Sequence, residues 1–152
     1  MYLVPCALII MFIKIYFNDK PLFLCDNIDE TINLCIYGKD YFGGEIDKLQ
    51  SRAVNKRHIK IVRVNDLKEL ARCQAIFFSK SINNHLSTIL GDLQNRPILT
   101  LADNPHALSE GIVINMNLSN EKIVFEINLG VARKSGLDIS SKLLQLAVKV
   151  HQ

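Results

Sequence analysis

A glycine-rich turn is the feature of this chain whose residue types could bind a phosphate group. The apolar run over residues 32–37 (INLCIY) is followed by the segment 38–44, GKDYFGG. Doubly wound folds bind phosphates at such a turn, at the carboxyl end of the first strand. The spacing matches neither a Walker A loop nor G-x-G-x-x-G, so a tight turn explains the segment without a ligand. Its candidates for contact with a ligand or partner are Gly38, Asp40, Tyr41, Phe42 and Gly43.

Acidic side chains mark two other predicted strands. Asp103 comes directly after an apolar run, where an α/β enzyme would place an acid. The dipeptide Asn104-Pro105 also indicates a turn, which explains Asp103 as a capping residue. Glu126 shares one face of a later strand with Asn128, and it fits either a pocket residue or a charge that discourages edge-to-edge pairing. No Ser-His-Asp set follows from these positions, so we expect a protein that is not an enzyme.

The sequence gives little evidence for a metal site or for nucleic-acid binding. The four histidines lie far apart, without ligand spacing to one another or to a cysteine: His58, His85, His106 and His151. We therefore expect no metal site and no cofactor. The net charge is only +3, and the one basic cluster, within residues 52–63, contains no interleaved aromatic residues. We interpret this cluster as a solvated edge and expect no nucleic-acid partner.

The four cysteines are Cys6, Cys25, Cys35 and Cys73, and no C-x-x-C motif occurs. Cys35 lies inside the first predicted strand, and Cys73 lies at the entry to the third. These two strands are neighbours in a flavodoxin-like strand order, about 4.8 Å apart, so a disulfide is sterically allowed. Two buried free thiols that pack as small apolar residues remain an equal alternative at this point.

Alternating apolar and helical segments indicate how these residues are positioned. Strands are predicted over residues 32–37, 59–64, 75–78, 97–101, 112–116 and 123–128. Helices are predicted over residues 42–49, 67–72 with Asp66 as N-cap, and 82–90 with Gly91 as its end. The last two strands form a hairpin through the turn 117–121. The predicted fold is a Rossmann-like three-layer α/β sandwich, whose mainly parallel sheet carries an antiparallel edge hairpin.

The segment after the last strand predicts two short helices. Gly136 ends the first, whose last turn carries Arg133 and Lys134, where cations suit the helix dipole. Ser140 and Ser141 then precede apolar residues at helical spacing, which predicts an N-capped second helix. No acid, base or nucleophile is arranged for catalysis in this segment.

The N-terminal segment has two interpretations. Residues 1–17 are strongly apolar, but they are short for a membrane span and are interrupted by Pro5 and Lys14. They lack the basic region and cleavage motif of a signal peptide, so a targeting remnant and the first core helix both remain open. We therefore separate residues 1–31, an N-terminal helix and loop, from a single α/β domain over residues 32–152.

The quoted segments together resemble the YfiR/HmsC-like family of bacterial periplasmic proteins. The C-terminal run FEINLGVARKSGLDISSKLLQLA is the most specific match, and the turn after the first strand is the next. The matching runs cover residues 32–49, 52–64, 73–79, 96–103, 111–118 and 125–147. Family members usually end their first helix in a Trp-Pro pair, for which Lys20-Pro21 is the nearest substitute here.

The resemblance implies an exported, dimeric regulatory protein without catalytic activity. Such a protein binds the periplasmic domain of an inner-membrane diguanylate cyclase and represses cyclic di-GMP synthesis and biofilm formation. Membrane association would then occur only through this partner, or through a membrane sensor kinase. The alternative is a small-ligand or nucleotide-binding α/β protein, or a receptor component coupled to such a kinase, with the glycine-rich turn and Asp103 in its pocket.

The resemblance also implies a disulfide and a set of binding surfaces. Family disulfides fit a pair between Cys35 and Cys73, and no cysteine remains for a second, C-terminal bond. The candidate surfaces for the partner are the first helix, the Tyr41-Phe42 turn and the C-terminal helix. Tyr41 and Phe42 could equally pack inward against the end of the sheet.

Overall fold

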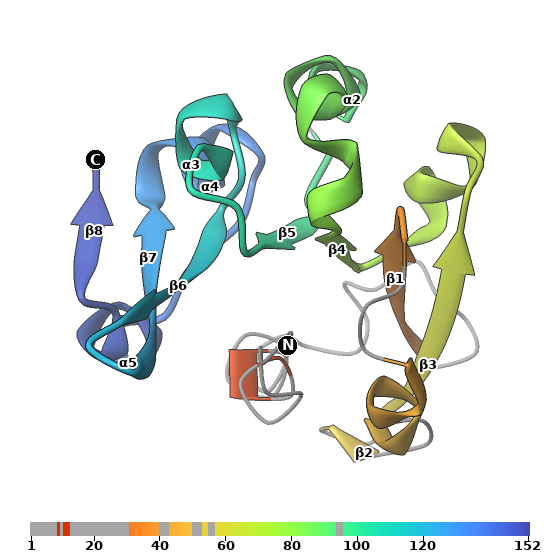
Figure 1. Ribbon diagram of the computed structural model, residues 1–152, viewed down its shortest axis with the longest axis horizontal. Helices are drawn as coiled ribbons and strands as arrows, with labels where there is room; N and C mark the ends of the chain where they lie inside the picture. Colours follow the sequence, from red (N-terminus) through yellow and green to blue (C-terminus); the bar gives the residue numbers. More distant parts are fainter. Residues whose placement is uncertain are drawn as a thin grey trace.

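One mixed sheet organises this protein. The computed structural model describes residues 9, 11–12, 31–39, 43–49, 53–54, 57–93 and 96–152. In this part of the chain the strand order is β2-β3-β1-β4-β5-β6-β7-β8, and Figure 1 shows β3 to β8 following one another from right to left. The strands are β1 (Thr31–Tyr37), β2 (Ala53–Val54), β3 (Arg57–Val64), β4 (Ala75–Phe78), β5 (Leu99–Ala102), β6 (Ile114–Ser119), β7 (Lys122–Asn128) and β8 (Lys149–His151).

Most neighbouring strands run parallel. β1 pairs in parallel with β3 on one side and with β4 on the other, and β5 joins β4 to β6 in the same sense. β6 and β7 form an antiparallel hairpin, and the short β2 is antiparallel to β3. The structure therefore confirms the predicted Rossmann-like sandwich with a mainly parallel sheet, in the flavodoxin-like order expected for its central strands.

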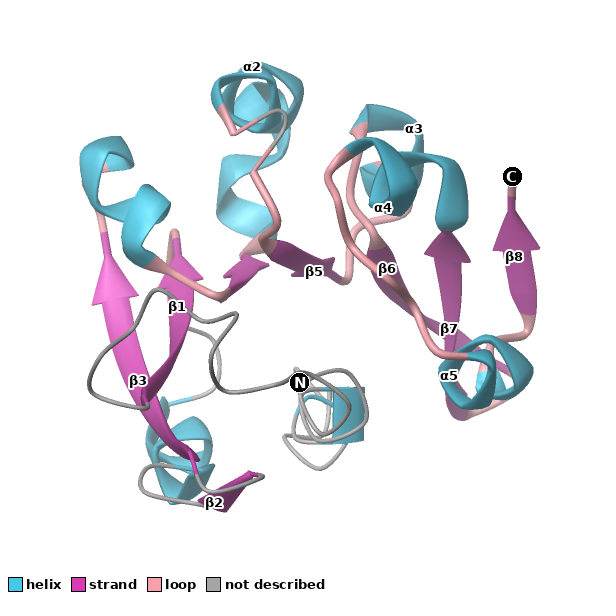
Figure 2. Cartoon of the chain, turned by 180° about the vertical axis from the view of Figure 1, so that it is seen from behind, coloured by secondary structure: helices cyan, strands magenta, loops and turns pink. Residues whose placement is uncertain are grey.

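Helices cover both faces of this sheet. Within the described residues, the 3-10 helices include η2 (Gly43–Leu49), η3 (Leu67–Arg72) and η4 (Lys80–His85), and the α-helices include α2 (Leu86–Asp92), α3 (Ala107–Glu110), α4 (Leu129–Lys134) and α5 (Ser141–Leu146). Seen from either side, α2 stands beside the α3–α4 pair (Figure 2). Helix α5 lies at the other ends of β7 and β8, away from α3 and α4.

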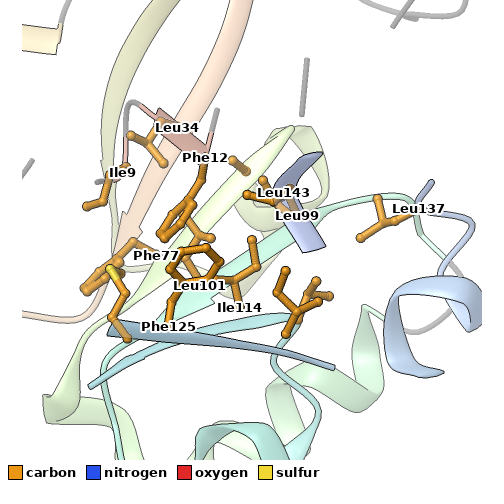
Figure 3. Close-up of a cluster of buried hydrophobic side chains, with 14 of the residues drawn as sticks. Ile9, Phe12, Leu34, Phe77, Leu99, Leu101, Ile114, Phe125, Leu137 and Leu143 are labelled. Atoms are coloured by element: carbon orange, nitrogen blue, oxygen red, sulfur yellow. The ribbon is translucent and has the colours of Figure 1, made fainter. Parts of the chain in front are cut away.

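Alternating side chains of the central strands build a core on each face. In β1, Ile32, Leu34 and Ile36 join a large cluster that also contains Phe77, whereas Cys35 points into a smaller cluster with α2. The same period of two places neighbouring residues of β4 and β5 in opposite clusters, as expected for strands buried on both faces. Figure 3 shows how the large cluster gathers side chains from strands and helices that are distant in sequence.

Local capping signals are largely confirmed. The Asp66 carboxylate accepts a hydrogen bond from the Lys68 amide at 3.0 Å and caps η3. Ser140 Oγ accepts from the Leu143 amide at 3.3 Å and caps α5. Gly136, with a φ of +78°, follows α4, whose last turn carries the two predicted cations. Each cap satisfies backbone groups that a helix end leaves without partners.

Several predicted boundaries are wrong. The predicted helix 82–90 is divided into η4 and α2 at His85, which has non-helical angles (φ −121°, ψ 4°), and α2 continues through Gly91 to Asp92. The hairpin turn is shorter than predicted, because Asn120 and Glu121 both adopt positive φ values of 50° and 66°. This conformation closes a hairpin through two residues and lets both strands extend further.

The sheet also extends beyond the strands predicted from the sequence. β8 pairs with β7 on the far side of the hairpin, so β7 is an interior strand. β2 and β8 contain only two and three residues. Such short segments give too few alternations for a periodic pattern to appear.

The described residues of the N-terminal segment belong to the hydrophobic core. Ile9 and Phe12 are fully buried, and Met11 packs against the same cluster. The Phe12 ring meets Phe125 of β7 edge-on, with centroids 4.7 Å apart. In the described part of the chain, no helix is both long and apolar enough to span a membrane. The remaining residues of 1–30 lie outside the described part, and the domain boundary at residue 31 stays a prediction.

Candidate functional site

The glycine-rich turn packs against the start of η4. Gly38 follows β1 with a φ of +97°, and the Lys39 amide donates a hydrogen bond to Ser81 Oγ at 2.8 Å. A Cβ atom added to Gly38 would lie 2.8 Å from Ser81 Oγ and 3.0 Å from Ser79 Cβ. Side chains of the protein thus occupy the space beside Gly38, which accounts for this glycine without a ligand.

Substitution of Gly38 tests this packing role. We expect Gly38→Ala to lower the free energy of unfolding by about 2 kcal/mol, since alanine is strained at positive φ and its methyl group crowds Ser81. Gly44→Ala is the matched control, because an added Cβ there meets nothing within 4 Å. The control variant should be neutral or slightly stabilising. Urea unfolding of both variants measures the difference, and equal stabilities would contradict the assignment.

The other candidates of this turn are only partly described. Gly43 begins η2, whereas Asp40, Tyr41 and Phe42 lie outside the described residues. Asp103 directly follows β5, and β4 lies between β5 and β1 in the sheet. A shared pocket of the turn and Asp103 would therefore have to span the end of β4.

The turn that follows Asp103 is stabilised by the side chain of Asn104. Asn104 Oδ1 accepts a hydrogen bond from the His106 amide at 3.1 Å. The backbone of Asn104 exchanges two hydrogen bonds with the buried side-chain amide of Asn115 on β6, at 3.1 and 2.8 Å. The predicted turn is present, and Asn104 makes the side-chain hydrogen bond that defines it.

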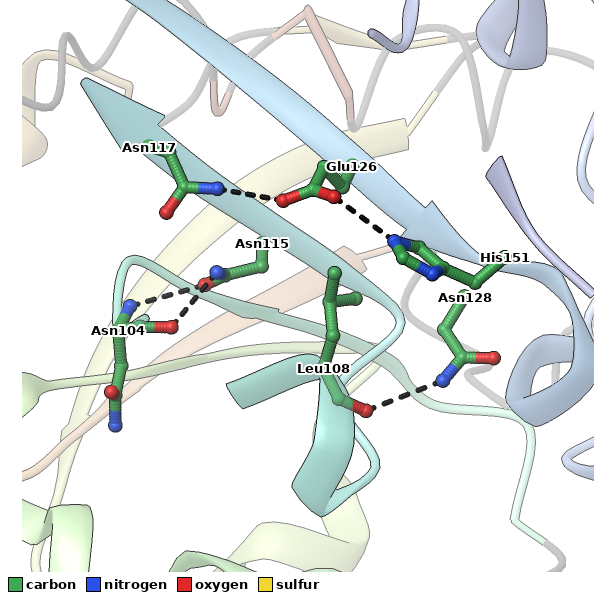
Figure 4. Close-up of polar contacts among 7 residues, drawn as sticks. All are labelled: Asn104, Leu108, Asn115, Asn117, Glu126, Asn128 and His151. Atoms are coloured by element: carbon green, nitrogen blue, oxygen red, sulfur yellow. Dashed lines mark hydrogen bonds and ion pairs between the residues drawn. The ribbon is translucent and has the colours of Figure 1, made fainter. Parts of the chain in front are cut away.

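Glu126 joins three strands through its carboxylate (Figure 4). Oε2 accepts from Asn117 Nδ2 of β6 at 2.9 Å, and Oε1 lies 3.0 Å from His151 Nε2 of β8. The edge-charge interpretation of Glu126 is wrong, because β8 covers the outer side of β7. Sequence reasoning missed His151 as a partner because the three-residue strand that carries it gave no signal.

Asn128 has a structural role at the start of α4. Its Oδ1 accepts from the Val131 amide at 3.1 Å, which makes it the N-cap of this helix. Its Nδ2 donates to the Leu108 carbonyl oxygen at 3.3 Å and ties α4 to α3 (Figure 4). Both the oxygen and the nitrogen of the Asn128 side-chain amide therefore make hydrogen bonds within the protein.

The basic cluster is only partly a solvated surface. Arg63 makes a two-point contact with Asp47 of η2, with nitrogen–oxygen distances of 2.9 and 3.2 Å. Arg57, at the start of β3, is almost completely buried. Arg52 and Lys56 lie outside the described residues.

A disulfide connects Cys35 of β1 to Cys73, which lies two residues before the start of β4, with Cα atoms 6.0 Å apart. Both residues are buried in the smaller core, with exposed fractions of 2% and 4%. The parallel pairing of β1 with β4 brings them together, as the family resemblance implied. Cys6 and Cys25 lie outside the described residues.

One cavity was not predicted from the sequence. It measures about 240 Å³ and lies between α2 and the α3–α4 pair. Glu110 and Thr100 are among its polar lining residues. Its lining comes from four separate segments, so no local motif could have signalled it. Among the described residues, no group of histidine, cysteine and acidic side chains is arranged to hold a metal ion.

Comparisons with known proteins agree with this architecture. A conserved domain protein from Vibrio cholerae has 10% sequence identity and a TM-score of 0.62, over 96% of this chain and 60% of that one. An ABC domain from Streptococcus pneumoniae in complex with L-Trp has 11% identity and the same TM-score, over 96% of this chain and 62% of that one. At these identities the likeness concerns the fold alone.

The chain spans about 60% of the length of these two structures. No functionally characterised protein matched its sequence. The sequence profile of one family does match, over residues 26–148, which include every strand from β1 to β7 and the disulfide. This protein therefore belongs to the YfiR/HmsC-like family.

Proposed function

We propose that this protein is a periplasmic regulatory binding protein that represses a membrane diguanylate cyclase through its periplasmic sensor domain. Such repression lowers cyclic di-GMP and biofilm formation. The observation that carries the proposal is the family match over residues 26–148. The buried disulfide supports an oxidising compartment, since disulfides persist there and are rare in the cytosol.

Three of the described candidates also favour a binding role over catalysis. Asn128 caps a helix, Glu126 links three strands, and Gly38 accommodates Ser79 and Ser81. Each role is structural and requires no substrate. A repressor of this kind would act through a protein surface, and we expect it to act as a homodimer. The alternative partner is a membrane sensor kinase in place of the cyclase.

We assign the partner-binding surface to the junction of α5 and β8. Leu146 and Val148 are 50% and 60% exposed and lie only two residues apart. Exposed apolar side chains that lie together mark interaction sites more often than isolated ones do. The first helix fits less well as a contact surface, because Ile9 and Phe12 are fully buried. Leu67, 45% exposed in η3 beside β3, lies at the other end of the sheet.

The test is the cellular level of cyclic di-GMP after deletion of the gene. We expect the level to rise, and to return when the wild-type protein is supplied. A Leu146→Glu, Val148→Glu protein should fold but fail to restore the level, because buried carboxylates without partners oppose binding. We expect these two substitutions to weaken the complex with the periplasmic domain of the cyclase at least about tenfold.

Leu67→Glu serves as the control, because it introduces a glutamate at an exposed leucine far from the proposed surface. This variant should complement like the wild type. An unchanged cyclic di-GMP level in the deletion strain would overturn the proposed function. If both variants complement equally, the function stands and the partner surface lies elsewhere.

A further inference from the structure

The cavity between α2 and the α3–α4 pair has the composition of a small-ligand site. From the sheet side it is lined by Ile98, Thr100 and Val113, and from the helices by Leu90 and Val131. These side chains are apolar apart from Thr100, which is 5% exposed and already accepts a hydrogen bond from the Val113 amide at 2.9 Å. The Thr100 hydroxyl can still donate one hydrogen bond. This part of the cavity can therefore hold a hydrocarbon group.

Glu110 is an acidic residue in the lining of this cavity. Its Oε2 atom is shielded from water and has no hydrogen-bond partner among the described residues. A buried carboxylate oxygen without a hydrogen bond destabilises the folded protein. A hydrogen-bond donor from a ligand would remove this cost. The terminal torsion of a glutamate side chain is soft, so the carboxylate can turn either oxygen towards the cavity.

The C-terminal ends of three helices also favour a positively charged ligand in this cavity. Gly91 near the end of α2, Gly111 after α3 and Ser135 after α4 all line the cavity. Carbonyl oxygens at helix C-termini carry partial negative charge and favour a cation. Arg96 and Lys134 also line the cavity but are exposed, and their long side chains can keep their charges in water.

From these contacts we propose that the cavity binds a small organic cation, a primary amine that carries one compact apolar group. The ammonium group donates to Glu110, and the apolar group lies against Leu90, Ile98 and Val131. The volume of about 240 Å³ suits a ligand of roughly ten non-hydrogen atoms. This site is independent of the proposed partner surface at α5 and β8.

Benzylamine is a suitable probe, with benzyl alcohol and benzoate as neutral and anionic analogues of the same shape. Each compound is titrated into the full chain while backbone amide signals are followed by NMR. We expect benzylamine to bind with a Kd of about 1 mM and to shift the amides of Gly91, Gly111 and Ser135. Benzyl alcohol and benzoate should bind at least about tenfold more weakly.

Two substitutions test whether Glu110 binds the ammonium group and whether the ligand lies in the cavity. Glu110→Gln keeps the shape of the side chain and should reduce benzylamine binding to the level of benzyl alcohol, whereas Glu69→Gln, an exposed glutamate on η3, should change nothing. Val131→Phe should fill the cavity and abolish binding of all three compounds. Equal binding of the amine and the alcohol, or an unchanged affinity in Glu110→Gln, would overturn the proposal. No shift at about 10 mM benzylamine would also overturn it.

Discussion

Replacement of Cys35 and Cys73 by alanine is expected to lower the free energy of unfolding by about 4 kcal/mol. The bond closes a loop with a sequence separation of 38 residues, and its main effect in the chain-entropy model is to restrict the unfolded chain. Urea unfolding of the oxidised wild type and the double variant measures the difference. A Cys6→Ser, Cys25→Ser background in both proteins prevents alternative disulfides.

Alanine substitution also removes two packed sulfur atoms, so a second comparison is needed. The same wild-type chain, unfolded, reduced and refolded with reductant present, loses the bond and keeps the side chains. We expect this reduced protein to account for most of the loss. If oxidised and reduced wild type unfold at the same urea concentration, the disulfide contributes nothing to stability.

Burial of the disulfide has a further consequence for the folded protein. With exposed fractions of 2% and 4%, the two cysteines are out of reach of a reductant unless the chain opens. Reduction of the native protein should therefore be slow and should accelerate in urea below the unfolding transition. This behaviour is that of a structural bond, since disulfides that act as redox switches are exposed or strained.

Phe12→Ala is expected to cost about 3–5 kcal/mol of stability. The Phe12 ring is fully buried and packs edge-on against Phe125, so its removal leaves a cavity between the first helix and the sheet. Thermal unfolding should show a fall in Tm of roughly 10 °C. The substitution tests whether the N-terminal segment is part of the core or only a targeting remnant.

Met11→Ala is the matched control in the same segment. Met11 is half-buried, so its truncation should cost clearly less than that of Phe12. A Phe12→Ala variant as stable as Met11→Ala would show that the segment does not pack on the sheet in solution. The domain would then begin near residue 31, as the targeting interpretation requires.

Short-range patterns in the sequence were sufficient to predict most elements of the fold. The continuous apolar run over residues 32–37 became β1, and the alternation over 59–64 lies within β3. Asp66 and Ser140 cap the helices that follow them. Strand periodicity and capping depend on residues within a few positions of one another, so one sequence carries enough information to predict them.

The roles of the candidate site residues depended on contacts that are distant in sequence. Glu126 meets His151, 25 residues later, only because a three-residue strand joins the sheet outside the hairpin. The residues alone left Cys35 and Cys73 as a disulfide or as two free thiols, and the family resemblance favoured the bond. The pairing of β1 with β4 places the two sulfur atoms together.

Local patterns were therefore sufficient to predict most elements, the sheet type and the family. Which polar side chains bond within the protein, and where a cavity remains, follows from the packing of the whole domain. Local periodicity encodes the face on which a side chain lies, since it follows from backbone geometry alone. Partners and cavities depend on how faces from separate segments pack together, as Glu110, Thr100 and Val131 do around one cavity, and no local pattern contains that information.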